Sequence, residues 1–352
     1  MNDKQTAAKP TKKISVHDVA REAGVSIGSV SRVLNGGRYT STDLVARVTS
    51  AARKLGYQPD AKAQSLRSGT SRTIGCLVTD ITNPLYAACV SAIETRLAAD
   101  GFMLLLACSH YDAARENELI KLFEARGMDG MIVATVGDGD TPVSQVLGES
   151  RVPVVVLDRD FDLDADYVLI DHRAGVASAV KYLAELGHTR IALFTPGMGM
   201  RPARERIAGY LEAHKAAKLA VDRKLIRGIS NQVHTTYDDM RALLQMGEAP
   251  TAVIGMSSRI VSGALRAIHE AGLKVPADIS VVSIGSSEAT ELMWPPMTQV
   301  RFDAEAHGRA AAEVLLERLR RIDEPRRKVT LSTQLVVGNS CAAPPVVKKT
   351  RR

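Results

Sequence analysis

From residue 72 onward the chain alternates short apolar runs with segments in which apolar residues recur every three or four positions. Apolar runs bounded by polar residues are typical of strands buried on both faces, whereas the longer spacing is typical of helices. The strands predicted are 74–78, 102–108, 130–135, 152–158, 190–194, 251–256 and 279–284. The helices predicted between them lie near 86–100, 115–126, 174–186, 203–217 and 258–271.

This alternation predicts parallel sheets that carry helices on both faces. The strand–helix units are too many for one small open sheet, so we expect two similar α/β lobes. Ligands of such sheets bind beyond the carboxyl ends of the strands, which places a binding cleft between the lobes.

Two short helices joined by a tight turn are predicted near the start of the chain. Ser15 followed by Asp18 forms a capping box, so the first helix is expected to begin near Val16. Gly24 supplies the turn, and Ser26 caps the second helix. The inward-facing positions predicted for the pair are Val19, Ala20, Ala23, Val30, Val33 and Leu34.

A third helix is predicted to start after Ser41 and to run to about Leu55, where Gly56 ends it. Its expected buried stripe is Val45, Val48, Ala52 and Leu55. Three short helices around one small core therefore form an all-α head. Pro59 then breaks the chain, and a short helix of low intrinsic stability is expected before Ser68.

The charge of the chain is concentrated at its start. Residues 1–72 hold 13 Lys and Arg against 5 Asp and Glu, whereas the rest holds 33 against 34, within a formal net charge of +7. Positive charge gathered on one end suits the binding of nucleic-acid phosphates. No apolar run approaches the roughly 20 residues needed to span a bilayer, so no membrane partner is expected.

Other chemistry is not indicated. The polar N-terminus lacks the apolar segment of a secretory signal, and Cys76, Cys89, Cys108 and Cys341 lack metal-ligand spacing, so reduced thiols in the cytoplasm are expected. No nucleophile elbow, zinc-protease motif or Walker motif is present, and the glycine-rich 137–140 segment lacks the Lys and Ser/Thr of a phosphate loop. We therefore expect no enzyme activity, no cofactor and no metal.

Several motifs follow one another along the chain in a fixed order. They are DVAREAGVS, SVSRVLN, LGYQPDAKAQSLRSG, IGCLVTDITNPLY, DGMIV, VPVVVLDR, LGHTRIAL, PTAVIG, GLKVPADISVVSIG and PPMTQV. On these motifs the chain resembles the LacI/GalR family of bacterial transcriptional regulators across roughly residues 14–340. The resemblance implies a helix-turn-helix head, a hinge helix and a two-lobed, periplasmic-binding-protein-like core that dimerises.

The function implied is that of a cytoplasmic, nucleoid-associated regulator, in the first instance a repressor. A homodimer would bind a pseudo-palindromic operator in double-stranded DNA, under the control of a small-molecule effector in the interlobe cleft. The alternative is a periplasmic-type small-molecule binding protein without DNA function, which would need a signal peptide and no basic head. The direction of the ligand response, and dimer against tetramer, stay open at this stage.

The resemblance also implies where the domains divide. The expected divisions are a disordered basic tail at 1–13, a DNA-binding head at 14–60, a hinge helix at 61–71, a core at 72–340 and a disordered tail at 341–352. The expected first lobe comprises about 72–187 and 302–325, and the expected second lobe about 188–300 and 328–340.

In the second helix, Ile27, Gly28 and Arg32 match base-facing positions of the family. Arg32 can give two hydrogen bonds to a guanine, and Ile27 can contact a thymine methyl group, unless Ile27 only packs on the head. Gly28 has no side chain with which to read a base, which suggests a close approach of the backbone. The positions that match phosphate contacts are Ser26, Ser29, Ser31 and Asn35.

Leu66 matches the hinge-helix leucine that wedges into the minor groove at the centre of the operator. Ala63 is expected to pack against the same residue of the partner's hinge helix. A helix this short is marginal in water, so its folding should depend on DNA and dimer contacts.

In the core, the sequence departs from the sugar-binding members of the family. Ser257-Ser258 and Gly285-Ser286-Ser287 stand where those members commonly carry acidic residues. Arg206 matches the family's ligand-contacting arginine. Further cleft candidates are Asp80, Asn83, Tyr86, His110, Arg159, Asp171 and His172, with Arg201 adding positive charge if it faces the cleft.

Loss of carboxylates with retention of arginines favours an anionic ligand, because Arg pairs with carboxylate or phosphate through two hydrogen bonds. A sugar acid or similar small organic acid is the first hypothesis for the effector. A neutral sugar and the absence of any effector are the alternatives. Trp294, before Pro295-Pro296, is expected either to stack on the ligand or to pack where the lobes connect.

Overall fold

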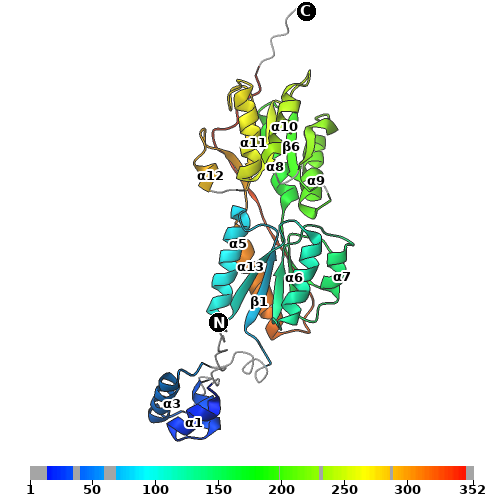
Figure 1. Ribbon diagram of the computed structural model, residues 1–352. Coiled ribbons are helices and arrows are strands. Elements are labelled where there is room, and N and C mark those ends of the chain that lie inside the picture. Colours follow the sequence, from blue (N-terminus) through cyan, green and yellow to red (C-terminus); the bar gives the residue numbers. More distant parts are fainter. Residues whose placement is uncertain are drawn as a thin grey trace, which may run out of the picture. The chain divides into compact units, whose positions relative to one another are not determined.

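The computed structural model describes residues 14–34, 40–58, 69–197, 199–229, 233–285 and 288–345 (Figure 1). The chain divides into two compact units, a head within Met1–Ser71 and a core within Arg72–Arg352. Each unit is described by itself below. Across the described ranges, no helix is both long and apolar enough to cross a membrane.

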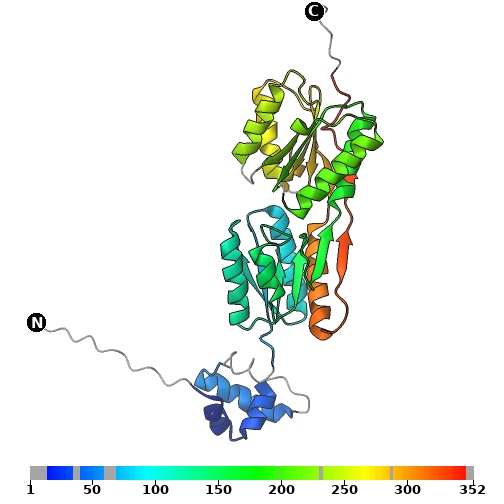
Figure 2. The same ribbon diagram turned by 90° about the vertical axis from the view of Figure 1, so that its right-hand side faces the viewer.

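Within the described residues, the head contains three helices with the expected ends, and Figure 2 shows them packed together in blue. They are α1 (Val16–Ala23), α2 (Ile27–Leu34) and α3 (Thr42–Leu55). The capping box of Ser15 and Asp18 is formed, with a Ser15 N–H to Asp18 Oδ2 distance of 3.0 Å. Gly24 ends α1 and Gly56 ends α3, both in the left-handed conformation that glycine adopts without strain.

One small core holds the head together. Its fully buried members are Val19, Val30 and Val48, joined by Ala20, Ala23 and Ala51. The predicted burial of Val45 is wrong, because its side chain is 38% exposed. The other predicted positions of α3 are confirmed, because Val48 is buried and Ala52 and Leu55 pack against the same core, which Leu44 and Ala51 join.

The core contains two six-stranded sheets. The first sheet runs in the order β11 (Lys328–Leu331), β5 (Asp166–Ile170), β4 (Val154–Leu157), β3 (Gly130–Val133), β1 (Thr73–Val78), β2 (Met103–Cys108). The second runs in the order β12 (Gln334–Val336), β10 (Thr298–Arg301), β9 (Ser280–Ile284), β8 (Ala252–Met256), β6 (Ile191–Pro196), β7 (Ile226–Ile229). All neighbouring strands are parallel except β10 and β12.

Helices cover both faces of each sheet, as the alternating pattern predicts. On the first sheet, α5 (Pro84–Ala99) and α13 (Ala304–Arg320) cover one face, and α6 (Ala113–Ala125) and α7 (Pro142–Gly148) cover the other. On the second sheet, α8 (His172–Glu185) and α9 (Arg201–Ala216) lie opposite α10 (Val233–Leu244) and α11 (Ser257–Glu270). The described part of the core also contains the short helix α12 (Glu288–Glu291) and a 3-10 turn, Arg223–Leu225.

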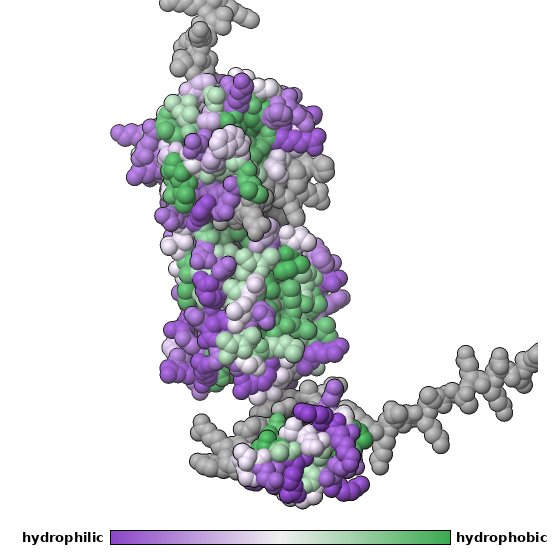
Figure 3. All heavy atoms as spheres, turned by 90° about the vertical axis from the view of Figure 1, so that its left-hand side faces the viewer, coloured by the Kyte–Doolittle hydropathy of each residue, from purple (hydrophilic) through white to green (hydrophobic). Residues whose placement is uncertain are grey.

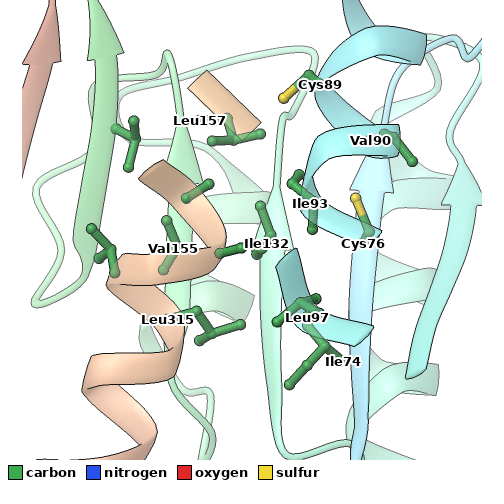
Figure 4. Packing of buried hydrophobic residues seen from close by; sticks show 14 of the residues in the cluster. Ile74, Cys76, Cys89, Val90, Ile93, Leu97, Ile132, Val155, Leu157 and Leu315 are labelled. Atoms are coloured by element: carbon green, nitrogen blue, oxygen red, sulfur yellow. The ribbon is translucent and has the colours of Figure 1, made fainter. Parts of the chain in front are cut away.

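The packing of α5 and α13 joins distant parts of the sequence in the first lobe. Ile93 and Leu97 of α5 lie beside Leu315 of α13, over Ile132 and Val155 of the sheet (Figure 4). All five side chains are fully buried. The first lobe is therefore completed by a helix that lies more than 200 residues after α5 in the sequence.

The chain passes between the lobes at other places than predicted. Helix α8 packs on the second sheet, where its Val180 and Leu183 contact the cluster around Leu193, so the first crossing follows β5 rather than residue 187. Residues 328–331, predicted in the second lobe, pair with β5 and belong to the first. The lobes are connected after β5, after β10 and after β11.

A buried ion pair fastens the end of α13 to the start of β5. Arg318 donates from Nε to Asp166 Oδ2 at 2.8 Å and from Nη2 to Oδ1 at 2.9 Å. The two side chains are 2% and 1% exposed. Asp166 Oδ1 also accepts the backbone N–H of Arg327 at 2.8 Å, which holds the segment that leads into β11.

Replacement of Asp166 by Asn should destabilise the core by about 3–5 kcal/mol, because it leaves the Arg318 charge buried without its partner. Urea denaturation followed by circular dichroism measures this loss. The matched control is Asp164→Asn, which removes an ion pair with Arg326 where the Asp164 side chain is 80% exposed, and it should change the midpoint little. Equal midpoints for the two variants would contradict the structural role of the buried pair.

Candidate functional site

One side of α2 is open and carries the residues predicted to read bases. Ile27 is 41% exposed, and Gly28 and Arg32, four residues apart on the same face of the helix, are also exposed. Ile27 is therefore not part of the buried core of the head. Ser26 is exposed as well, while Ser29 and Ser31 are half-buried.

Ser26 begins α2 in the way that the sequence predicts. Its Oγ accepts the backbone N–H of Ser29 at 3.2 Å and lies 3.0 Å from Ser29 Oγ. The absence of a side chain at Gly28 has no packing cause, because an added Cβ would meet nothing nearer than Ser26 Oγ at 3.8 Å. Asn35, Ala63 and Leu66, also predicted to contact DNA or the partner hinge, lie outside the described residues.

A brace that the sequence analysis missed fixes the turn between α1 and α2. Arg47 of α3 donates from Nη2 to the carbonyl oxygens of Ala23, at 2.7 Å, and of Gly24, at 3.0 Å. These carbonyls lie at the end of α1, where the helix itself leaves acceptors unsatisfied. Arg47 therefore helps to set the angle at which α2 leaves the turn.

A cavity of about 120 Å³ lies between the two lobes of the core. It is bounded by residues at the carboxyl ends of parallel strands, among them Thr79 after β1, Asp158 after β4, Ile170 of β5 and Met256 of β8. This is the position predicted for a ligand cleft. Five of the predicted effector residues line the cavity: Asn83, Tyr86, Arg159, His172 and Arg206.

The other predicted effector residues do not line it. Asp80 Oδ1 accepts from the backbone N–H and the hydroxyl of Thr82, so this carboxylate orders its own turn. Asp171 caps α8 by accepting the N–H of Ala174 at 3.0 Å. His110 is exposed at a positive φ of 54°, and Gly285 has a φ of 84°. The side chain of Ser257 lies outside the described residues.

Trp294 takes neither of the two places expected for it. Its side chain is 90% exposed and does not line the cavity, so it neither packs between the lobes nor stacks on a ligand there. Leu292, two residues earlier, is 85% exposed. The second lobe therefore carries two exposed apolar side chains in this segment.

A network of charged side chains surrounds the cavity and crosses from one lobe to the other. The Asp158 carboxylate receives His172 Nε2 at 2.7 Å on Oδ2 and Arg201 Nη1 at 2.9 Å on Oδ1. His172 Nδ1 in turn lies 3.2 Å from Arg206 Nη2, which must donate because guanidinium has no acceptor. His172 is therefore a neutral ring that links Asp158 to Arg206.

Burial and neighbouring charges together set the protonation of this network. Burial lowers the pKa of His172 from 6.5 to about 4, against the attraction of Asp158. Burial would raise the pKa of Asp158, but His172 and the nearby cations hold it below its ordinary value. Burial also lowers the pKa of Arg206 to about 10, so this side chain stays charged at neutral pH.

Arg159 and Arg206 are both buried, at 5% and 4% exposure, without an ion pair to a carboxylate in the described part of the chain. Arg159 donates from Nε to the backbone carbonyl of Thr135 at 2.6 Å and from Nη1 to the backbone carbonyl of Asp158 at 3.0 Å. Arg206 contacts Thr195 Oγ1 at 3.5 Å, and its Nε has no hydrogen-bond partner among the described residues.

A second set of contacts joins the lobes at the edge of the cavity. Asp138, whose side chain is 1% exposed, accepts from the backbone N–H of Arg201 and from Arg204 Nη1, the latter at 2.8 Å. Arg204 Nη2 also lies 3.7 Å from Asp160. The start of α9 is thus held by acidic residues of the first lobe, and the glycine-rich 137–140 segment provides one of them.

Sequence reasoning missed Asp158, Tyr111, Phe302 and His307, all of which line the cavity. A signal for Asp158 was present, since it directly follows a buried strand and precedes Arg159. Phe302 and His307 lie beyond β10 and reach the cavity only because the chain crosses back to the first lobe there. Their placement depends on the topology of the two sheets rather than on a local pattern.

Two family models match the chain. Residues 15–60 match the bacterial regulatory proteins of the lacI family, and residues 180–341 match a periplasmic binding protein-like domain. The ribose operon repressor of Escherichia coli (strain K12) is 32% identical over 329 residues, which cover 93% of this chain and 99% of that repressor.

Solved structures agree in fold over nearly the whole chain. The Lac repressor dimer bound to operator and the anti-inducer ONPF has a TM-score of 0.84 at 26% identity and covers 94% of this chain and 100% of that one. The complex of transcriptional regulator CelR with cellobiose has a TM-score of 0.72 at 30% identity, with 93% and 99% covered.

The lowered pKa of His172 predicts how stability depends on pH. Between pH 6.5 and 4 the unfolded chain binds a proton at this residue that the folded core excludes, so the free energy of unfolding should fall as the pH falls through this window. His172→Gln should make that dependence shallower in urea titrations at several pH values. His269→Gln, at the exposed end of α11, is the control, and an unchanged slope for His172→Gln would refute the assignment.

Proposed function

The chain belongs to the LacI family of bacterial regulatory proteins, DNA-binding repressors controlled by small-molecule effectors, and we propose that it represses transcription as a homodimer on a pseudo-palindromic operator. In this proposal the effector binds in the cavity between the lobes. The observation that carries it is the exposed face of α2, with Arg32 beside the side-chain-free surface of Gly28, on a unit separate from the ligand-binding core. No catalytic role is proposed for the core, and the site of action is the chromosome in the cytoplasm.

In the DNA complex, we place α2 in the major groove, with Ile27, Gly28 and Arg32 toward the bases and Ser26, Ser29, Ser31 and Asn35 toward phosphates. The N-terminal turns of a recognition helix are the part that reaches base edges. Leu66 of each protomer would open the central base step, with the two Ala63 residues in contact between the hinge helices.

Exposed apolar side chains support the homodimer. Met103 is 68% exposed, Leu105 43% and Leu106 38%, all on β2, which is an edge strand of the first sheet. Hydrophobic residues also gather on the side of the first lobe that carries α5 (Figure 3). Leu292 and Trp294 are two further exposed apolar side chains, on the second lobe. Such surface is typical of contacts between subunits.

The coupling from effector to DNA would pass through the relative position of the lobes. The cavity is lined from both lobes, and the contacts of Arg201 with Asp138 and Asp158 bridge them. A ligand that changes the closure of the cleft would therefore shift the two lobes at the dimer contact. In the proposed scheme the hinge helices then separate and the affinity for the operator falls.

Genome-wide mapping of bound sites, followed by footprinting of the strongest one, tests the function. The expected result is a protected pseudo-palindrome with two half-sites bound by one dimer. A protein that protects no specific site, including none upstream of its own gene, would contradict the repressor role. The neighbouring genes of bound sites would also indicate the pathway that is regulated.

Gly28→Ala separates the stability of the head from its affinity for DNA. Ala should stabilise α2 by about 1 kcal/mol in the free protein, because Gly is the poorer helix former and the added Cβ has room. If the backbone approaches the DNA closely at this position, operator affinity should nevertheless fall, as measured by fluorescence anisotropy. Higher stability together with unchanged affinity in Gly28→Ala would remove the close-approach explanation.

Arg32→Ala should cost about 1–3 kcal/mol of operator binding, and Arg126→Ala, on the core surface, should cost little.

Leu105→Glu should dissociate the homodimer, because it places a charge within an apolar contact between subunits. Sedimentation velocity at micromolar concentration would then give a monomer. Leu122→Glu on α6 is a matched control, since Leu122 is also 43% exposed but lies on another element, and it should leave the dimer intact. A dimeric Leu105→Glu protein would exclude β2 from the interface.

A further inference from the structure

We propose that the effector is an anion, a small polyhydroxy molecule that carries a carboxylate or phosphate group, and that Arg159 and Arg206 hold this group. The inference rests on the proposed function in taking the interlobe cavity as the effector site. It goes further by giving the chemical class of the ligand, in contrast to the neutral sugar cellobiose in the CelR complex.

The charges around the cavity are out of balance. Three guanidinium groups, of Arg159, Arg201 and Arg206, stand near a single carboxylate that lines the cavity in the described part of the chain, that of Asp158. His172 links Asp158 to Arg206 as a neutral ring, and the carboxylate of Asp158 is matched by Arg201. Asp158 therefore acts on Arg201, Arg159 and Arg206 together, and this one lining carboxylate offsets the charge of the two lining arginines only in part.

The positive charge of Arg159 and Arg206 is energetically unfavourable because both side chains are buried. Burying a cation without an opposite charge is unfavourable by several kcal/mol, and proteins usually pair such groups or supply them with a ligand. Arg206 also has a buried Nε that finds no hydrogen-bond partner in the part of the chain that the structure describes. An anionic group in the cavity would satisfy both the charge of the two arginines and this donor, through the two-hydrogen-bond geometry that guanidinium forms with carboxylate and phosphate.

A neutral sugar would find the lining carboxylate and amide oxygens already in use as acceptors. Both oxygens of Asp158 are already engaged, by His172 and by Arg201. The carbonyl oxygen of the Asn83 side chain accepts the N–H of Leu85 at 3.1 Å. Arginine can only donate, so it serves the acid group of a ligand rather than its hydroxyl hydrogens.

The cavity is also small. Its volume of about 120 Å³ favours the smaller members of this ligand class. Tyr86 and Thr79 offer hydroxyl groups to its polar part, and Phe302 offers an apolar wall beside His172, at a ring distance of 6.3 Å.

Matched pairs of ligands test the charge requirement on the full chain. The acids are D-gluconate, D-ribonate, D-glycerate and glucose 6-phosphate, and the neutral partners are D-glucose, D-ribose and glycerol. Calorimetry measures binding, and operator affinity is measured in the same samples by fluorescence anisotropy. We expect at least one acid to bind and to change operator affinity while its neutral partner does neither, and the acid that binds distinguishes carboxylate from phosphate.

Variants locate the acid group. Arg206→Lys and Arg159→Lys keep the charge but lose the paired donors, so each should weaken the acid roughly 10- to 150-fold, the effect of one or two charged hydrogen bonds. Arg173→Lys, in a surface pair with Glu212, is the control and should bind the acid like the parent. Operator binding without ligand shows that each variant is folded.

Three results would overturn the inference. They are binding of neutral sugars alone, acid binding that the Arg159 and Arg206 variants leave unchanged, and no binding or change of operator affinity by any acid at about 10 mM. Failure of the proposed repressor function would give a different result from these three, because the protein would then bind no operator even without ligand.

Discussion

The ionised carboxylate of Asp158 joins the parts of the core that would have to move together. It ends β4 in the first lobe, receives His172 at the start of α8, and receives Arg201 at the start of α9 in the second lobe. Its own backbone has a positive φ of 52°, a conformation that L residues adopt at a cost of about 1–3 kcal/mol. The hydrogen bonds to its two oxygens hold it there. The shape of the cavity, the orientation of Arg206 and the contact between the lobes all depend on this group.

Much of the fold follows from the sequence because the central strands are buried on both faces. Runs such as VVVL at β4 and SVVSI at β9 are unmistakable, and helices such as α1 and α3 carry caps that define their ends. Strands β7, β10 and β12 lie at or near a sheet edge or contain polar residues, so their pattern is weak. The predicted crossings between the lobes are wrong because the sequence of α8, like that of β11, does not specify which of the two sheets the element joins.

The candidate site was predictable in part for a similar reason. Residues that follow a strand, such as Arg159, reach the cavity because the carboxyl ends of the strands meet there. Asp80 and Asp171 follow strands as well, but their carboxylates turn back to order local backbone. One or two hydrogen bonds decide whether a carboxylate after a strand faces the cavity or binds the local backbone. Those hydrogen bonds depend on atomic positions that a sequence pattern does not specify.

The order of the strands has a consequence for folding during synthesis on the ribosome. The first lobe needs α13 and β11 to cover α5 and to complete its sheet, and these are made after the whole of the second lobe. The three helices described for the head, in contrast, are all complete in sequence once residue 55 has been made. Chains still in synthesis, or cut short before α13, therefore carry a finished DNA-reading unit attached to an unfinished sensor. Such chains expose the apolar side of α5 and are natural clients of chaperones and proteases.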